Sequence, residues 1–437
     1  MGKLGRVRNA AGALAAQFSQ AAGSLLIGIV AGHQLPLDGF ATVQLVLGVV
    51  VVTTAISTGL VGDSLTVLNR SDPALRAALG VVLAVIVALV ATLSALISLV
   101  THVMSTGGSL AFGILIAVWL AEDTLRRLLM ASGRFWSIVA VDSTHLLVSG
   151  TLVIGWRPVT GRDIEVPMVL LALAAGQVAA TVVAIARLPR HERHLGHRPT
   201  RAAVSEVVRF GTQRAVQAAL RPVVLLALRL IVVAAVGKTL YGQLELARLW
   251  AAPALLVVNG AGSFLLASFA KQREHRRSSL RKSDAAAVLL TVSSLAATGA
   301  ALLGSHLFPT LMAKHPAEPV AILAWGLYTA SVGLVMPYGS LGAVSGRQRN
   351  VLHVRLAETV ASLGFLVLLV PTGIWGPQLS PVAIAFGSIV GAMLMRPVAA
   401  RAVVRPSRHR EDAESKDESP EPDRPRRPRT APLSHRA

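Results

Sequence analysis

The segment AALGVVLAVIVALVATLSALISLV, residues 77–100, contains no charged side chain. As an α-helix, a segment of this length rises roughly 36 Å at about 1.5 Å per residue. That is enough to cross the roughly 30 Å hydrocarbon core of a bilayer. Its apolar residues are continuous and do not alternate with polar ones, which excludes the strands of an outer-membrane barrel. The segment therefore predicts a transmembrane helix.

Apolar segments of this kind recur along the whole chain. Of its 437 residues, 53% are hydrophobic and 15% are charged, and the mean hydropathy is +0.61. A soluble domain needs more polar surface than this to cover its core. The sequence predicts an all-α integral membrane protein with about twelve transmembrane helices: Gly12–Gly32, Phe40–Gly62, Ala77–Val100, Ser109–Met130, Trp136–Trp156, Val166–Ala186, Gln213–Gly237, Leu244–Phe269, Ala285–Phe308, Pro319–Ala343, Val351–Pro371 and Pro381–Val404.

The positive charges indicate how these helices are oriented. With the N-terminus inside, only Arg157, Arg162, Lys238 and Lys314 of the 42 Lys and Arg residues lie in external segments. Because basic residues favour the cytoplasmic side, we expect a multi-pass protein of the plasma (inner) membrane with both termini in the cytoplasm. The basic N-terminus leads into a first helix that we expect to be retained.

The formal net charge of +20 does not indicate nucleic-acid binding. Most of the basic residues flank predicted spans, where they set orientation and contact anionic membrane lipids. The chain has no cysteine, which excludes disulfides and thiolate metal sites. The external loops are too short to hold a catalytic domain. We therefore expect no catalytic residues, no metal site and no cofactor.

Repeated residues suggest that the chain has two related halves. Gly39 lies at the turn between the first and second predicted spans, and Gly242 lies at the turn between the seventh and eighth. They are 203 residues apart, as are Gly59 and Gly262. The sequence Ser-Gly-Arg at residues 132–134 recurs at residues 345–347. We expect two six-helix lobes related by a parallel pseudo-repeat. The predicted units are a lobe at 1–187, a basic cytoplasmic linker at 188–204, a lobe at 205–404, and a disordered charged tail at 405–437.

The seventh predicted span contains basic residues at membrane depth. Arg214 and Arg221 share a helix face because they are seven residues apart, and Gln217 lies between them. An arginine at the bilayer centre costs about 2.5–3.5 kcal/mol. Arg221 and Arg229 are therefore candidate cavity residues for an anionic substrate. Alternatively, Arg214 reaches the cytoplasmic surface, and Arg229 reaches the opposite surface or pairs with Glu245.

Two further pairs of residues have spacings that allow contact on one helix face. Glu245 and Arg248 are three residues apart, so they either form a local ion pair or contact the substrate. Asp142 and His145 have the same spacing and form either a candidate proton relay or a pair that stabilises helix packing.

The chain resembles the polysaccharide-repeat (O-antigen type) flippases of the multidrug/oligosaccharidyl-lipid/polysaccharide exporter superfamily. The resemblance lies in residues 25–39 with the span that ends at Gly59 to Gly62, in residues 122–142, and in the Gly242 corner followed by Pro253. It implies twelve helices in two lobes, a central cavity lined by basic residues, and alternating access. Arg221, Arg229 and Arg248 match that cavity, and the implied substrate is a lipid-linked oligosaccharide on an isoprenoid pyrophosphate.

The sequence therefore favours a flippase that translocates a lipid-linked oligosaccharide for cell-envelope polysaccharide assembly. The expected partners are this anionic glycan, membrane lipids, and a polysaccharide polymerase or glycosyltransferases. The first alternative is a multidrug or small-solute antiporter of the same fold. The second is a non-transporting scaffold of a polysaccharide synthesis complex. A membrane glycosyltransferase or polymerase is disfavoured, because no cluster of carboxylates occurs in the external loops.

Overall fold

The computed structural model describes residues 3–68, 72–189, 192, 198–271, 276–344, 348–369 and 376–404, and they form helices joined by short loops. No strand occurs in these ranges. The helices are α1 (Lys3–Gln34), α2 (Leu37–Ser57), the π-helix η1 (Thr58–Gly62), α3 (Asp63–Val67), α4 (Pro73–Val100), α5 (Thr106–Ala131), α6 (Phe135–Thr160), α7 (Val166–Arg187), α8 (Arg201–Lys271), α9 (Arg276–Leu307), α10 (Pro319–Val344), α11 (Gln348–Leu369), the 3-10 helix η3 (Pro377–Leu379) and α12 (Ser380–Val404).

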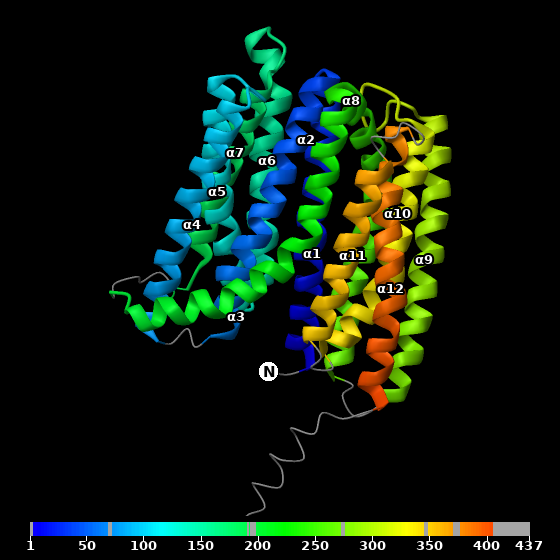
Figure 1. Cartoon of the computed structure of the whole chain (residues 1–437). Coiled ribbons are helices and arrows are strands. Elements are labelled where there is room, and N and C mark those ends of the chain that lie inside the picture. The colour runs from blue at the N-terminus through cyan, green and yellow to red at the C-terminus, as the bar shows by residue number, and fades with distance from the viewer. Residues whose placement is uncertain are drawn as a thin grey trace, which may run out of the picture.

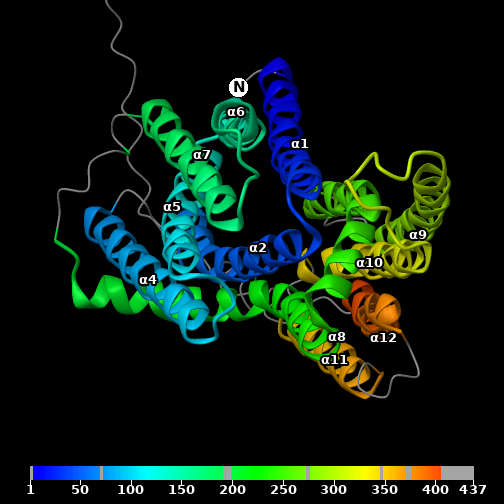
Figure 2. The same cartoon turned by 90° about the horizontal axis from the view of Figure 1, so that it is seen from above.

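The helices form two lobes (Figures 1 and 2). In the N-terminal lobe, α1 packs on α6, and α5 packs on α4 and α7. In the C-terminal lobe, α10 packs on α8, α9 and α12, and α11 packs on α12. We call the face where α1 begins and α12 ends the terminal face, and the opposite face the distal face (Figure 1). Many apolar side chains on the outside of the bundle are exposed, as expected for a lipid-facing surface.

Helix α8 joins the lobes and contains two membrane crossings. It begins with a segment that runs along the terminal face and then rises beside α2 (Figure 1). Gly237 has non-helical backbone angles, φ 84° and ψ 172°, which only glycine adopts readily. The chain reverses there and returns towards the terminal face. At about 1.5 Å per residue, its 62-residue apolar stretch, Arg201–Gly262, is far too long for a single crossing.

The two lobes approach each other closely where η1 meets the beginning of α8. A Cβ atom on Gly59 would lie 2.2 Å from the backbone of Ala215, and one on Gly211 would lie 2.4 Å from the Leu60 carbonyl oxygen. These distances are too short for any side chain, so glycine is required at both positions. Beside this contact between η1 and α8, Arg214 Nε donates to Asp63 Oδ2 at 3.0 Å. The contact holds the first part of α8 on the N-terminal lobe.

The predicted fold class is confirmed. Among the described residues, eleven helices are long and apolar enough to span a membrane, and α8 crosses twice, which is consistent with about twelve spans. Several predicted boundaries shift: the second span ends in a π-helix, and α1 extends back to Lys3. The expected tail, residues 405–437, lies outside the described residues, and so does the repeated motif at 345–347.

The first prediction concerns which sides of the membrane the two faces occupy. Thr160 ends α6 on the distal face, and Thr200 precedes α8 on the terminal face, and both are exposed. Because the chain has no cysteine, Thr160→Cys and Thr200→Cys each introduce one reactive thiol. In intact cells an impermeant maleimide should label the first variant and spare the second. Permeabilised cells should label both, and equal labelling in intact cells would contradict the crossing by α7.

Candidate functional site

A polar cavity lies inside the N-terminal lobe, between α1, α5, α6 and α7. The space between its side chains, together with the adjoining part that is open to the outside, is about 480 Å³. Its lining is unusually polar for a membrane interior: Ser19, Gln20, Gly23, Ser24, Ile27, Trp119, Glu122, Asp123, Arg126, Asp142, His145 and Gln177. Three carboxylates and one guanidinium contribute to it. Arg126 and Arg127 pair with two of these carboxylates, which leaves Glu122 as the group suited to a cation or a proton.

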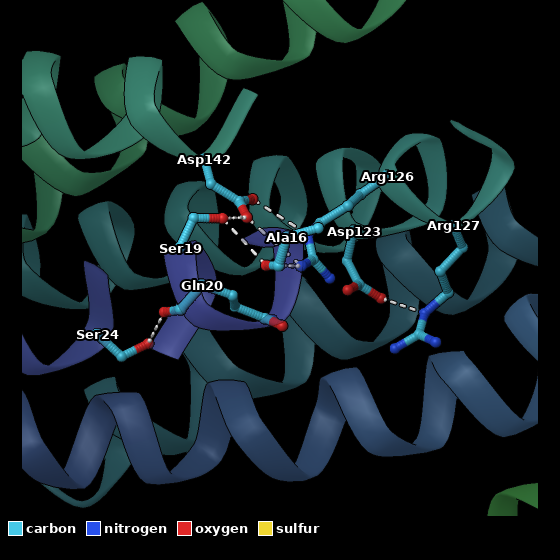
Figure 3. A network of polar contacts seen from close by, with 8 residues as sticks. All are labelled: Ala16, Ser19, Gln20, Ser24, Asp123, Arg126, Arg127 and Asp142. Atoms are coloured by element: carbon cyan, nitrogen blue, oxygen red, sulfur yellow. Dashed lines mark hydrogen bonds and ion pairs between the residues drawn. The ribbon is translucent and has the colours of Figure 1, made fainter. Parts of the chain in front are cut away.

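Arg126 links three helices beside this cavity (Figure 3). Its Nε donates to Asp142 Oδ1 at 3.0 Å, and its Nη2 donates to the Ala16 carbonyl oxygen at 3.2 Å. Ser19 donates to Asp142 Oδ2 at 2.7 Å. On the same helix, α5, Arg127 pairs with Asp123 at 2.8 Å. Each of these two arginines is thus neutralised by an aspartate, as expected in a medium of low dielectric constant.

Asp142 and His145 both line the cavity, but they have different partners. Asp142 contacts Arg126 and Ser19. The His145 ring lies edge-on to Trp119, with the ring centroids 5.6 Å apart, and its Nδ1 is 3.4 Å from Ser149 Oγ. The direct Asp–His contact expected from their spacing is replaced by these interactions. Their role as a proton relay stays a prediction.

A second cluster surrounds Glu245, whose side chain is completely buried. Arg229 Nε lies 3.2 Å from Glu245 Oε1, and Arg248 pairs with Glu245 Oε2. Both arginines also reach across to Gln44 of α2: Arg229 Nη1 donates to its carbonyl oxygen at 2.7 Å, and Arg248 Nη2 donates to its Oε1 at 2.9 Å. We call Gln44, Arg229, Glu245 and Arg248 the Glu245 cluster. In this structure both arginines are engaged with protein groups.

A third cluster surrounds Arg221 in the C-terminal lobe. Its Nε donates to the hydroxyl of Tyr328 on α10 at 3.2 Å, and its guanidinium lies 5.5 Å from the centre of the Tyr328 ring. Arg221 Nη2 is buried and has no hydrogen-bond partner among the described residues. Nearby, Glu358 accepts from Arg355 at 2.7 Å and from Ser388 at 3.0 Å. Arg221 therefore keeps donors for a further ligand.

The remaining sequence candidates lie near these clusters. Gln217 is half-buried on α8, one turn before Arg221. Arg214, which we considered able to reach the surface, pairs with Asp63. Within the described ranges, no three His, Asp or Glu side chains are grouped so as to hold a metal ion.

Sequence reasoning missed several members of the clusters. Gln44 and Tyr328 are neutral residues in apolar helices and carry no signal of a charged neighbour. Glu358 did carry a signal, because Arg355 precedes it by three residues, which is the spacing that identified Glu245 and Arg248. Asp63 directly follows the second predicted span and lies outside every predicted helix.

Comparison with known proteins identifies the fold of the chain but shows no family for it. No protein-family model matches the chain, and no curated protein matches it. Among solved structures, a multidrug resistance MATE family transporter of the MOP superfamily in an inward-facing conformation aligns with a TM-score of 0.70 at 12% identity, covering 92% of this chain and 96% of that one. An outward-facing conformation of such a transporter gives 0.62 at 12% identity, with coverages of 92% and 95%.

A third solved structure bears on pocket charge. It is a MOP superfamily transporter from Pyrococcus furiosus, which aligns with a TM-score of 0.60 at 13% identity over 92% of this chain and 95% of that one. Its pocket is described as having reverse polarity, which suggests a different function for that protein. At these identities the similarity establishes the MATE-like two-lobe fold.

The second prediction concerns the buried pair in the N-terminal lobe. Arg126→Met leaves Asp142 without its cation, which should cost about 3–5 kcal/mol and lower the melting temperature in detergent. The matched control is Arg157→Met. Arg157 pairs with Asp163 at 3.5 Å, and their side chains are 72% and 85% exposed, so this change should cost at most about 1 kcal/mol. Equal melting temperatures for the two variants would contradict a structural role for Arg126.

Proposed function

We propose that this protein is an alternating-access membrane transporter that carries amphiphilic substrates between its two lobes. The observation that carries the proposal is the match of nearly the whole chain to the fold of transporters solved in both inward- and outward-facing conformations. The higher TM-score belongs to the inward-facing one. In our proposal, the terminal face is cytoplasmic, the membrane is the plasma membrane, and the structure is the inward-facing state.

The first candidate substrate class is small amphiphilic solutes, including drugs. The solved structures of this fold include transporters described as multidrug resistance proteins. In this chain, the cavity of the N-terminal lobe supports the same assignment, because its carboxylates outnumber its single guanidinium. A cationic amphiphile would pair with Glu122 there without displacing Arg126 or Arg127 from its aspartate.

The second candidate is a lipid-linked oligosaccharide with a pyrophosphate group. Arg221 supports it, because a buried guanidinium with an unused Nη2 has the planar donor geometry that binds phosphate. Arg229 and Arg248 give weaker support, since Glu245 and Gln44 already occupy their donors. In this case the glycan would pass between the lobes while the lipid tail stayed in the bilayer.

The third prediction separates the two substrate classes. If small solutes are carried, expression in a bacterial host without its main drug-efflux pumps should lower the accumulation of a fluorescent amphiphilic cation severalfold relative to the same host without the protein. If a lipid-linked oligosaccharide is carried, deletion in the native host should instead make that lipid accumulate on the cytoplasmic leaflet. With the protein at normal membrane levels, no change in either assay would contradict transport and favour the scaffold alternative.

The fourth prediction concerns Arg221. If it binds a phosphate, Arg221→Ala should abolish export while the protein inserts at normal levels, because loss of a charge eases insertion. Arg221→Lys should restore only part of the transport, since an ammonium keeps the charge but loses the forked geometry. The matched control is Tyr328→Phe, which removes the protein acceptor of Arg221 Nε and should leave export largely intact. Wild-type export by a well-expressed Arg221→Ala variant would exclude the anionic substrate.

A further inference from the structure

The Glu245 cluster differs from the other charged clusters because it joins the two lobes. We propose that it is a latch that holds the distal halves of the lobes together and opens in each transport cycle. This inference rests on the proposed alternating access. It assigns Arg229 and Arg248 to the conformational change and not to substrate binding.

Both cross-lobe bonds of the latch end on one residue. Gln44 belongs to α2, whereas Arg229 and Arg248 belong to the two successive crossings of α8. One arginine donates to the main-chain oxygen of Gln44 and the other to its side-chain oxygen, at 2.7 and 2.9 Å. The position of α2 relative to both crossings of α8 is therefore fixed at a single point.

The surrounding residues leave room for these guanidinium groups. A Cβ atom on Gly48, one turn after Gln44, would lie 2.4 Å from Arg229 Nη1. On α1, a Cβ atom on Gly28 would lie 2.7 Å from the side chain of Leu249, the residue after Arg248. Glycine at these two positions allows α1 and α2 to approach α8 closely enough for the hydrogen bonds to form.

Other contacts at the distal face join the same two lobes. Thr239 donates to Asp38 Oδ1 at 2.6 Å, beyond the Gly237 reversal. His33 Nε2 lies 3.1 Å from the Thr310 carbonyl oxygen. The backbone N–H of Lys314 donates to the Gly32 carbonyl oxygen at 3.1 Å. The latch is thus the buried, charged part of a closed distal face, and these bonds must separate if that face is to open.

The arrangement of charges makes the latch reversible. Glu245 lies on α8 with both arginines, so the ion pairs remain intact when α8 moves away from α2. Opening of the latch itself breaks hydrogen bonds to Gln44, an uncharged residue, and leaves Glu245 paired with both arginines. The Arg126–Asp142 pair lies instead within one lobe, and its separation would leave two unpaired charges. Only the Glu245 cluster, of these two, can open without that penalty.

Two variants test the latch without removing a charge. Gln44→Leu removes the acceptor of Arg248, and Gly48→Ala displaces Arg229 from the Gln44 carbonyl oxygen. Spin labels on Val159→Cys and Leu303→Cys, which are exposed positions on α6 and α9, report the distance between the lobes by double electron–electron resonance in lipid nanodiscs. Each variant should raise the population at the longer distance, relative to that at the shorter distance, about tenfold. That is the change expected for the loss of one hydrogen bond to a charged group.

The matched control is Gln243→Leu, the same change at a position two residues before Glu245. This variant should leave the ratio of the two populations unchanged. The latch is excluded if both test variants keep the wild-type distance distribution, or if the control shifts it equally. The measurement uses no substrate and no transport assay. The distances can therefore stay unchanged even if transport is established, and they can shift even if transport is not observed. The test of the latch is thus independent of the test of the proposed function.

Discussion

The hydrocarbon core of a bilayer offers no water to a buried polar group, and this constraint accounts for most of the structure. Backbone groups are satisfied within helices. Charged side chains need partners from the protein, because an unpaired ion in a medium of low dielectric constant costs several kcal/mol. Arg126 accordingly lies against Asp142, Arg229 against Glu245, and Arg214 against Asp63. Each pair joins two helical segments, which for Arg229 and Glu245 are the two crossings of α8, so the charged residues help to determine how the apolar helices are assembled.

The apolar helices themselves were predictable from the sequence, because a span is a local property. Length, hydropathy and the distribution of Lys and Arg predicted about twelve crossings without knowledge of any contact. Pairs on one helix were visible for the same reason, as for Glu245 and Arg248, which lie three residues apart. Glu358 and Arg355 show the same spacing and could have been identified in the same way.

The partners across helices were not predictable, because they depend on packing between distant segments. Gln44 is 185 residues from Arg229, and Asp63 is 151 residues from Arg214. Nothing in the local sequence of Gln44 distinguishes it from a polar residue that joins two helices. The expected contact between Asp142 and His145 failed for a related reason. Asp142 has Arg126 of the neighbouring helix as a partner, and a charged partner binds a carboxylate more strongly than a neutral imidazole does.

The buried charges also differ in sign between the lobes, which bears on the substrate. In the cavity of the N-terminal lobe, three carboxylates lie with Arg126, and Arg127 pairs with one of them, Asp123. In the C-terminal lobe, the clusters around Glu245 and Arg221 contain four arginines and two glutamates. Asp123 and Asp142 are paired with arginines, so Glu122 alone can make the N-terminal cavity negative, whereas the clusters of the second lobe hold two more arginines than glutamates. A substrate between the lobes would therefore meet charges of opposite sign on its two sides. In the transport that we propose, an anionic group would bind at Arg221 and a cation or proton at Glu122, and neither site would give up an existing ion pair.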